Sequence, residues 1–272
     1  MKIVQLNKFA ELLDRIDKED RSFAFLAGGT DIMPAVNFNY FDKEVVFDLS
    51  LFRNELHFIK ENEKSIEIGA LISLAEIANN KIIVEKVPQL ADSINSIGSK
   101  QIRNMGTLAG NIANASPIAD SSPVLLTLNV FINAISSMGE RAIPIDDFFI
   151  DYKKTSLRKN EIIKSISIPF NNLDGKYGFR KVSARPEIAI AKINLAYAIQ
   201  PNNVRFASGG AAKMPVRLKN VENNWGKDLS VKEWISVLNE DISPISDIRS
   251  TAEYRTHILA NIIEELSQSS PE

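Results

Sequence analysis

The chain has 272 residues, with 32 basic and 34 acidic side chains, and its net charge of −2 excludes a bulk electrostatic attraction to nucleic acid. The absence of cysteine excludes disulfides, thiolate metal sites, iron–sulfur ligation and a cysteine nucleophile from this chain. Two histidines are too few for a histidine-rich metal site, and they argue against a His-based catalytic triad.

The remaining composition is that of an ordinary globular protein. A hydrophobic content of 44% is typical of soluble domains, and the length allows one large domain or two medium ones. The first twenty residues acquire charges too early for a signal peptide, and no apolar run approaches membrane-spanning length. We therefore expect a cytoplasmic protein that contacts neither a membrane nor nucleic acid.

The first hundred residues predict alternating helices and strands. Apolar residues at helical spacing indicate an amphipathic helix within the first twenty residues. Apolar runs predict strands at 23–26, 45–49 and 66–70. A capping box from Ser73 to Glu76 and a proline at position 88 each predict the start of a further helix.

The strand predicted at 23–26 runs directly into a turn with two adjacent glycines. This turn consists of Ala27, Gly28, Gly29, Thr30 and Asp31. Its backbone can approach another group closely, and its exposed N–H groups could bind an anion. It could equally be a plain strand-to-helix turn in which Thr30 or Asp31 is the N-cap. Residues alone leave both interpretations open.

Residues 97–123 form a second glycine-rich stretch. Gly98, Gly106 and Gly110 are separated mostly by Ser, Thr and Asn, and the apolar residues follow neither a helical nor a strand period for long. We therefore expect an ordered loop without secondary structure of its own, anchored by single apolar residues. Such a loop would be a cradle for a ligand.

The rest of the chain divides into two regions. A helix at 121–126 and strands at 130–135 and 165–168 continue an α/β architecture to about residue 169. After a turn-rich linker at 171–175, short turns join three predicted strands, and a capping box from Ser250 to Glu253 opens a long helix. The three strands are expected at 177–182, 188–199 and 204–207. The second domain is therefore α+β, with a three-stranded antiparallel sheet and helices.

The two glycine-rich stretches suit a ligand that carries more than one anionic group. A diphosphate-containing nucleotide is the natural candidate, because backbone N–H groups can meet its charge without a lysine. Neither stretch has the G-x-G-x-x-G or G-x-x-x-x-G-K-[ST] pattern. A standard Rossmann dehydrogenase and a P-loop NTPase are therefore disfavoured.

Six segments, in order, resemble the FAD-binding subunits of molybdenum hydroxylases of the xanthine dehydrogenase and carbon monoxide dehydrogenase type. They read LAGGTDIMP, IGALISLAEIA, IGSKQIRNMGTLAGNIANASPIADSSPVLLTLN, YKKTSLRKNEIIKSISIP, RPEIAIAKIN and SDIRSTAEYR. The resemblance covers residues 3–266. It implies a two-part α/β FAD-binding domain at 1–169, with parts at 1–55 and 56–169, and a smaller C-terminal domain at 170–272.

The same resemblance implies the residues that bind FAD. In the family the first glycine turn contacts the diphosphate, and the second loop contacts the diphosphate, the ribityl chain and the flavin. A lysine in the second strand of the C-terminal domain also approaches the cofactor. The implied cofactor-binding residues here are Ala27, Gly28, Gly29, Thr30, Asp31, Gly98, Thr107, Gly110, Asn111, Asn114, Asp120 and Lys192.

Several of these residues also have a plain structural interpretation. Asp120 could accept hydrogen bonds from ribityl hydroxyls or cap the following helix. Lys192 could approach the cofactor or be an edge-strand charge that prevents strand pairing. Arg185 could steer a nicotinamide dinucleotide, although covering the sheet surface is the favoured interpretation.

Two positions depart from the family pattern. The family commonly has two adjacent glycines where this chain has Ala109 and Gly110. If position 109 requires a positive φ, alanine would be strained there by about 1 kcal/mol. Ile97 stands where some relatives place an aromatic residue near the flavin, so stacking on the flavin is in doubt at this position.

The resemblance implies an electron-transfer subunit. FAD would receive electrons from iron–sulfur clusters on a 2Fe-2S small subunit, which serves a molybdenum-cofactor-binding large subunit, and pass them to NAD or another acceptor. No catalytic side chain and no metal ligand is expected in this chain. The alternatives are a stand-alone flavin oxidoreductase and a non-catalytic scaffold that has lost FAD.

Overall fold

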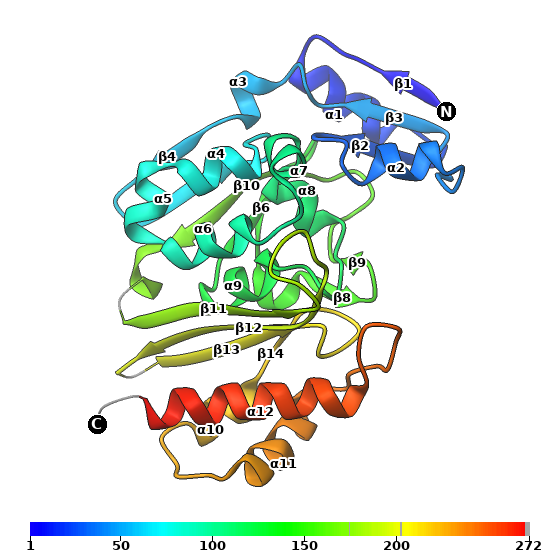
Figure 1. Cartoon of the computed structure of the whole chain (residues 1–272). Coiled ribbons are helices and arrows are strands. Elements are labelled where there is room, and N and C mark those ends of the chain that lie inside the picture. The colour runs from blue at the N-terminus through cyan, green and yellow to red at the C-terminus, as the bar shows by residue number, and fades with distance from the viewer. Residues whose placement is uncertain (174, 202, 270–272) are drawn as a thin grey trace.

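The computed structural model of the chain describes residues 1–173, 175–201 and 203–269. It consists of three parts that follow one another from the N-terminus to the C-terminus (Figure 1). Each part is built on one main sheet, and the order of the strands differs between them. The expected architecture, a two-part domain followed by a smaller C-terminal domain, is confirmed.

The N-terminal part is a parallel three-stranded sheet in the order β1-β3-β2. The central strand, β3 (Val45–Asp48), is buried along its whole length, as expected for a parallel strand covered on both faces. The remaining elements are β1 (Lys2–Val4), α1 (Phe9–Asp17), β2 (Phe23–Leu26), α2 (Ile32–Asn37) and α3 (Arg53–Leu56). The predicted first helix and the strands at 23–26 and 45–49 are confirmed.

The middle part is a five-stranded sheet whose strand pairs are all antiparallel, in the order β4-β5-β10-β6-β7. Its strands are β4 (Ile59–Glu61), β5 (Ser65–Gly69), β6 (Phe131–Ser136), β7 (Gly139–Pro144) and β10 (Ile162–Pro169). Its helices are α4 (Leu74–Asn79), α5 (Lys81–Lys86), α6 (Pro88–Asn95), α7 (Lys100–Met105), α8 (Leu108–Ala113) and α9 (Ser121–Thr127). A small hairpin, β8 (Phe149–Asp151) and β9 (Lys154–Thr155), lies between β7 and β10.

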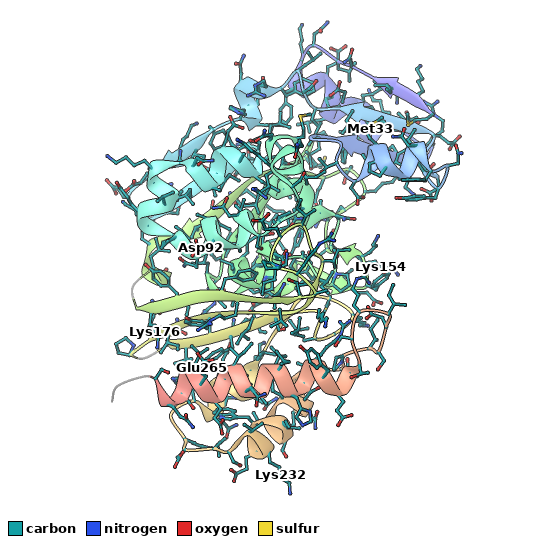
Figure 2. The ribbon with its side chains drawn as sticks, in the orientation of Figure 1. Met33, Asp92, Lys154, Lys176, Lys232 and Glu265 are labelled. Atoms are coloured by element: carbon teal, nitrogen blue, oxygen red, sulfur yellow. The ribbon has the colours of Figure 1, made fainter. Side chains whose placement is uncertain are left out.

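The C-terminal part is an antiparallel sheet with helices on one face. Its strands are β11 (Lys176–Ser183), β12 (Ala191–Gln200), β13 (Asn203–Gly209) and β14 (Val216–Arg217), and its helices are α10 (Lys219–Asn224), α11 (Val231–Asp241) and α12 (Ala252–Gln268). The sequence predicted three strands, and the fourth was missed because two residues show no period. Figure 2 shows Lys232, on α11, at the outer surface of this helical layer.

Capping differs from the sequence prediction at the last helix. The predicted box at Ser73 forms, with Ser73 Oγ accepting from the N–H of Glu76. The box predicted from Ser250 is wrong, because the N-cap of α12 is Thr251, whose hydroxyl accepts from the N–H of Tyr254. A capping box that the sequence analysis missed opens α11 at Ser230.

The C-terminal sheet is sandwiched between helices of two parts. One face packs on α6 and α9, and the other packs on α10 and α12. Successive residues of a strand point to opposite faces. Accordingly, Ala196 joins the main core on the side of α6 and α9, while its neighbour Leu195 joins the core of the C-terminal helices. The sheet is thereby fixed against the middle part that carries the glycine-rich stretch.

Candidate functional site

The two glycine-rich segments touch each other through their backbones. A Cβ atom added to Gly28 would lie 1.8 Å from the carbonyl oxygen of Met105 and 2.9 Å from Cα of Gly106. Only glycine fits such an approach. The carbonyl oxygen of Gly106 also accepts a 2.8 Å hydrogen bond from the N–H of Leu74, which fixes the contact against α4. Residues separated by nearly eighty positions thus form one site.

A cavity of about 360 Å³ lies between the two segments. Nine of the twelve predicted residues line it: Ala27, Gly28, Gly29, Thr30, Asp31, Thr107, Gly110, Asn111 and Asn114. Asn114 Nδ2 donates a 3.2 Å hydrogen bond to Asp31 Oδ1, which ties the segments together across the cavity mouth. The structure therefore brings together most of the residues that the sequence singled out.

The first glycine-rich segment offers backbone N–H groups as hydrogen-bond donors. Among the hydrogen bonds of residues 1–173, 175–201 and 203–269, none is donated by the backbone N–H of residues 28–31. Asp31 is the N-cap of α2 by position, but its side chain makes no capping hydrogen bond. The turn thus joins β2 to α2 with Asp31 as the N-cap, as one of the two interpretations expected, but without a side-chain capping hydrogen bond. The N–H groups of the turn are available to an anionic ligand.

The second segment is not the loop that the sequence predicted. It contains two helices, α7 and α8, each six residues long. Their N-caps are Ser99, whose hydroxyl accepts from the N–H of Ile102, and Thr107, whose hydroxyl accepts from the N–H of Gly110. Helices of less than two turns show too few apolar positions for a period to be recognised. The expectation of a loop without secondary structure was wrong for this reason.

Ala109 carries no backbone strain. It lies inside α8, is buried, and is not among the described residues with positive φ. The condition under which alanine would be strained at position 109, a positive φ, is therefore not met. The left-handed residues of the stretch are Gly98, with φ of 49°, and Ala115, with φ of 47°. Alanine disfavours that conformation, so Ala115 is the strained position.

Gly98 lies beside the main cavity rather than in its lining. It lines a neighbouring polar cavity of about 400 Å³ that is closed on the other side by residues 186–188 of the C-terminal part. Ile97, the residue before it, lines the main cavity. Arg185 belongs to the same C-terminal loop, where its guanidinium donates to the carbonyl oxygens of Glu187 and Ile188. Its side chain thus stabilises its own loop.

Asp120 is buried at the junction with the C-terminal sheet. Its Oδ2 lies 2.6 Å from Nζ of Lys181, and its Oδ1 accepts a 3.1 Å hydrogen bond from Asn194 Nδ2. Lys181 also donates to the carbonyl oxygen of Ser96 at 2.8 Å. Burial raises the pKa of Asp120, and the neighbouring ammonium opposes that rise. Asp120 makes no side-chain cap on α9, so the capping interpretation is not realised.

Lys181 is a residue that the sequence analysis missed. It lies on β11, its side chain is 10% exposed, and it is 61 positions away from its carboxylate partner. Lys192, which the sequence singled out, lies on β12 with its ammonium 5.1 Å from the ring centre of Tyr254. Because β12 is an interior strand, the alternative interpretation of Lys192 as an edge-strand charge is wrong. Lys192 lines neither the main nor the polar cavity.

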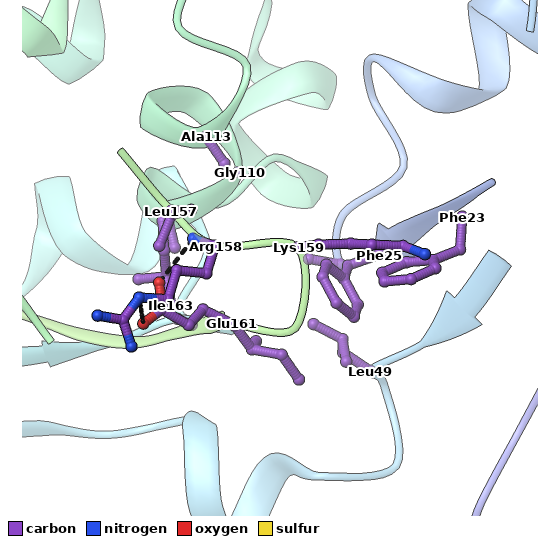
Figure 3. Close-up of a pocket in the computed structure, with 14 residues that line it drawn as sticks. Phe23, Phe25, Leu49, Gly110, Ala113, Leu157, Arg158, Lys159, Glu161 and Ile163 are labelled. Atoms are coloured by element: carbon purple, nitrogen blue, oxygen red, sulfur yellow. Dashed lines mark hydrogen bonds and ion pairs between the residues drawn. The ribbon is translucent and has the colours of Figure 1, made fainter. Parts of the chain in front are cut away.

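An apolar cavity of about 310 Å³ adjoins the main one, and Ala27, Gly110 and Ala113 line both. Figure 3 shows Phe23, Phe25 and Leu49 on one side of this cavity, and the loop that carries residues 157–161 beside them. The remaining apolar lining includes Ala70, Ala109, Leu157, Ile162 and Ile163. Such a lining suits a flat, uncharged ring system.

Charged side chains at the rim of the apolar cavity are held in place. Lys159 Nζ donates to the carbonyl oxygen of Glu19 at 2.9 Å and lies 5.5 Å from the ring centre of Phe23. Glu161 is buried and accepts two hydrogen bonds from the guanidinium of Arg141, at 2.6 Å and 2.8 Å. These hydrogen bonds lower the pKa of Glu161. Lys159 thus packs against the cavity wall.

The part of the chain that the structure describes offers no cluster of three or more metal-binding side chains. Within the same residues, no helix has both the length and the apolar character that crossing a membrane requires.

Comparison with known proteins identifies two adjoining family matches. Residues 1–171 match the FAD binding domain in molybdopterin dehydrogenase, and residues 178–269 match the CO dehydrogenase flavoprotein C-terminal domain. The glyceraldehyde dehydrogenase medium chain of Sulfolobus acidocaldarius is 34% identical over 243 residues, covering 86% of this chain and 85% of that protein. The nicotinate dehydrogenase FAD-subunit of Eubacterium barkeri is 25% identical, covering 89% and 86%.

The fold agrees with that of a solved relative. The carbon monoxide dehydrogenase of Hydrogenophaga pseudoflava contains a chain that superposes with a TM-score of 0.88, at 21% identity, over 97% of this chain and 95% of that one. Together with the family matches, the two touching glycine segments and the antiparallel C-terminal sheet lead to one conclusion. The chain belongs to the family of FAD-binding subunits of molybdopterin-dependent dehydrogenases.

Proposed function

We propose that the main cavity holds the diphosphate of FAD between the two glycine-rich segments. The observation that carries this proposal is the contact of Gly28 with the backbone of Met105 and Gly106, beside N–H groups of residues 28–31 that have no acceptor among the residues that the structure describes. Backbone N–H groups in a concave turn bind phosphate oxygens well. The hydroxyl of Thr30, the amide of Asn111 and the N–H groups of the turn would supply neutral donors to the ligand.

The neighbouring cavities suit the two ends of the same ligand. The apolar cavity shares lining residues with the main cavity, and its aromatic and aliphatic wall fits an adenine ring. The polar cavity begins at Gly98, next to Ile97 of the main cavity, and lies between the middle part and the C-terminal part. We assign the flavin end to this side. Gly98, Asp120 and Lys192 remain proposed contacts of the flavin end.

The C-terminal part would then close the site. The buried pair of Asp120 and Lys181 joins α9 to β11, and Asn194 from β12 adds a third member. A buried, hydrogen-bonded charge pair of this kind fixes relative geometry more than it adds stability. These residues hold the C-terminal sheet in one position against the middle part. Separate domains at 1–169 and 170–272 remain our proposed division of the chain.

The function that this arrangement supports is electron transfer within a multi-subunit molybdenum hydroxylase. When bound, FAD would supply the redox chemistry, accepting electrons that arrive through iron–sulfur clusters and releasing them to NAD or another acceptor. This chain binds and orients the cofactor and contributes no catalytic side chain. It has no cysteine to ligate a cluster. The clusters and the molybdenum cofactor would therefore lie on a 2Fe-2S small subunit and on a large subunit.

The names of two relatives support this assignment, because one is a medium chain and the other an FAD-subunit of a dehydrogenase. The test is purification of the protein at native levels, followed by identification of the copurifying chains and of bound flavin, iron and molybdenum. We expect a yellow assembly with one iron–sulfur chain and one molybdenum chain. An active flavoprotein without an iron–sulfur partner would show a stand-alone oxidoreductase. A colourless complex that does not take up added FAD would show that the protein is a non-catalytic scaffold.

A further inference from the structure

The segment at 114–120 connects the main cavity to α9 and contains a strained residue. Asn114 lines the cavity at one end, and Asp120 is the N-cap position of α9 at the other. Between them Ala115 is fully buried and has a φ of 47°. An alanine persists in this conformation only where its surroundings determine the backbone on all sides. Contacts with neighbouring residues must therefore hold the segment in this conformation.

The neighbours that hold it belong to the C-terminal part. The N–H of Gly210 donates a 2.7 Å hydrogen bond to the carbonyl oxygen of Pro117. Asn194 Nδ2 donates to the carbonyl oxygen of Ala119 at 3.3 Å. Gly210 itself has a φ of 82°, and a Cβ there would lie 3.0 Å from the carbonyl oxygen of Lys192. Two hydrogen bonds, at Pro117 and Ala119, thus join the segment to the residue after β13 and to β12.

A buried arginine fixes Gly210 from the other side. Arg255 of α12 is 2% exposed, and its guanidinium donates to the carbonyl oxygen of Gly210 at 3.0 Å and to Asp247 at 2.8 Å. Asp247 is fixed in turn, because it accepts from the N–H groups of Arg249 and Ser250. The chain of contacts runs from the turn at 246–250 through Arg255 and Gly210 to the strained segment.

We propose that Arg255 is a positioning residue for the FAD site. It acts through Gly210 on the segment at 114–120, which sets the position of Asn114 in the main cavity. The proposal rests on the assignment of the main cavity to FAD. It also gives a role to the last motif that the sequence analysis singled out, SDIRSTAEYR, whose Asp247 and Arg255 form the ion pair.

The molecule provides a matched control. Arg249 also pairs with Asp247, at 3.3 Å, but its side chain is 40% exposed and its hydrogen bonds are made to Asp247 rather than to Gly210. An exposed pair of this kind contributes little. A role for Arg255 that only stabilised the C-terminal part would lower the melting temperature without changing the backbone at 114–120. A positioning role changes both hydrogen exchange in that segment and affinity for FAD.

The experiment compares Arg255→Gln with Arg249→Gln in the full chain. FAD affinity is measured by titration of the folded protein, and hydrogen exchange of the amides of Ala115 and Ala119 is measured without FAD. We expect R255Q to weaken FAD binding by at least about tenfold, the scale of one charge-assisted hydrogen bond. It should also speed exchange of both amides. R249Q should stay within about twofold of the wild type in both measurements.

A rescue variant tests the role of the strain. Ala115→Gly removes the unfavourable left-handed alanine, so R255Q/A115G should bind FAD more tightly than R255Q. Should R255Q not fold, Asp247→Asn removes the charge while keeping an acceptor oxygen, and a smaller effect in the same direction is expected. Equal effects of R255Q and R249Q, or unchanged exchange at 115 and 119, would overturn the proposal. Failure of the wild type to bind FAD would overturn the proposed function instead, and the exchange data would still decide the positioning role.

Discussion

Replacing Gly28 with alanine should separate the two halves of the proposed FAD site. The added Cβ would lie 1.8 Å from the carbonyl oxygen of Met105, whereas Cβ contacts shorter than 3.0 Å are essentially never seen. The segments would have to part by about 1.2 Å, and a well-packed interior resists such a shift. Neither neighbour can rotate away, because the contacts of the new atom are with the backbone of Met105 and Gly106.

The cost can be estimated from overpacking in protein cores, which is about 1–3 kcal/mol. Since the displaced atoms line the proposed diphosphate site, we expect most of this cost to reduce ligand binding. FAD affinity should fall by roughly 10- to 100-fold, at about 1.4 kcal/mol per factor of ten. Quenching of flavin fluorescence on binding to the full chain measures this, and thermal unfolding monitors stability in parallel.

Gly178→Ala is the matched control for this variant. A Cβ at Gly178 would also be crowded, but by the hydroxyl and ring of Tyr197, at 2.5 Å from the oxygen, and Gly178 lines none of the described cavities at the glycine-rich segments. G178A should therefore lose stability while keeping its FAD affinity. Wild-type affinity in folded G28A, or an equal loss of affinity in G178A, would refute the reasoning.

Three further substitutions test the charged groups of the structure. Arg141 lowers the pKa of Glu161, so Glu161→Gln should cost about 2 kcal/mol of unfolding free energy at neutral pH. Because a lowered carboxyl pKa stabilises only the ionised form, the difference should shrink as pH falls below the ordinary value of 4.5. Lys181→Met leaves the buried carboxylate of Asp120 without its ammonium partner. We expect this to lower the unfolding free energy by about 3 kcal/mol in chemical denaturation at pH 7. Arg205 has two buried guanidinium nitrogens with no hydrogen-bond partner in the described part of the chain, and burial lowers its pKa, so Arg205→Met should stabilise by about 1 kcal/mol in the same assay.

Local signals allowed the elements and the core of the site to be predicted. The strand at 23–26, the capping box at Ser73 and the double glycine at 28–29 each have a local cause that is visible in the sequence. The two glycine-rich segments were expected to lie together because both suit one ligand that carries more than one anionic group. The resemblance to a known family then supplied the order of the parts and the cofactor.

Pairing between distant residues could not be predicted. Asp120 and Lys181 are 61 positions apart, and nothing near Lys181 distinguishes it from an exposed strand lysine. The helices α7 and α8 are too short to show a period, and they are stabilised by the caps at Ser99 and Thr107 and by packing. The backbone of Ala109 is helical, and the strained alanine of this stretch is Ala115, which no local pattern marks. These features depend on tertiary contacts that local patterns do not encode.

The most direct test of the account is a titration of the cofactor-free full chain with FAD and, separately, with FMN. If the two touching glycine segments hold the diphosphate and the apolar cavity holds the adenine, as proposed, much of the binding energy comes from the diphosphate and the adenosine. We therefore predict one FAD bound per chain, with FMN weaker by at least about 100-fold and ADP competing with FAD. Equal affinity for FMN and FAD, or no binding of either, would contradict the account.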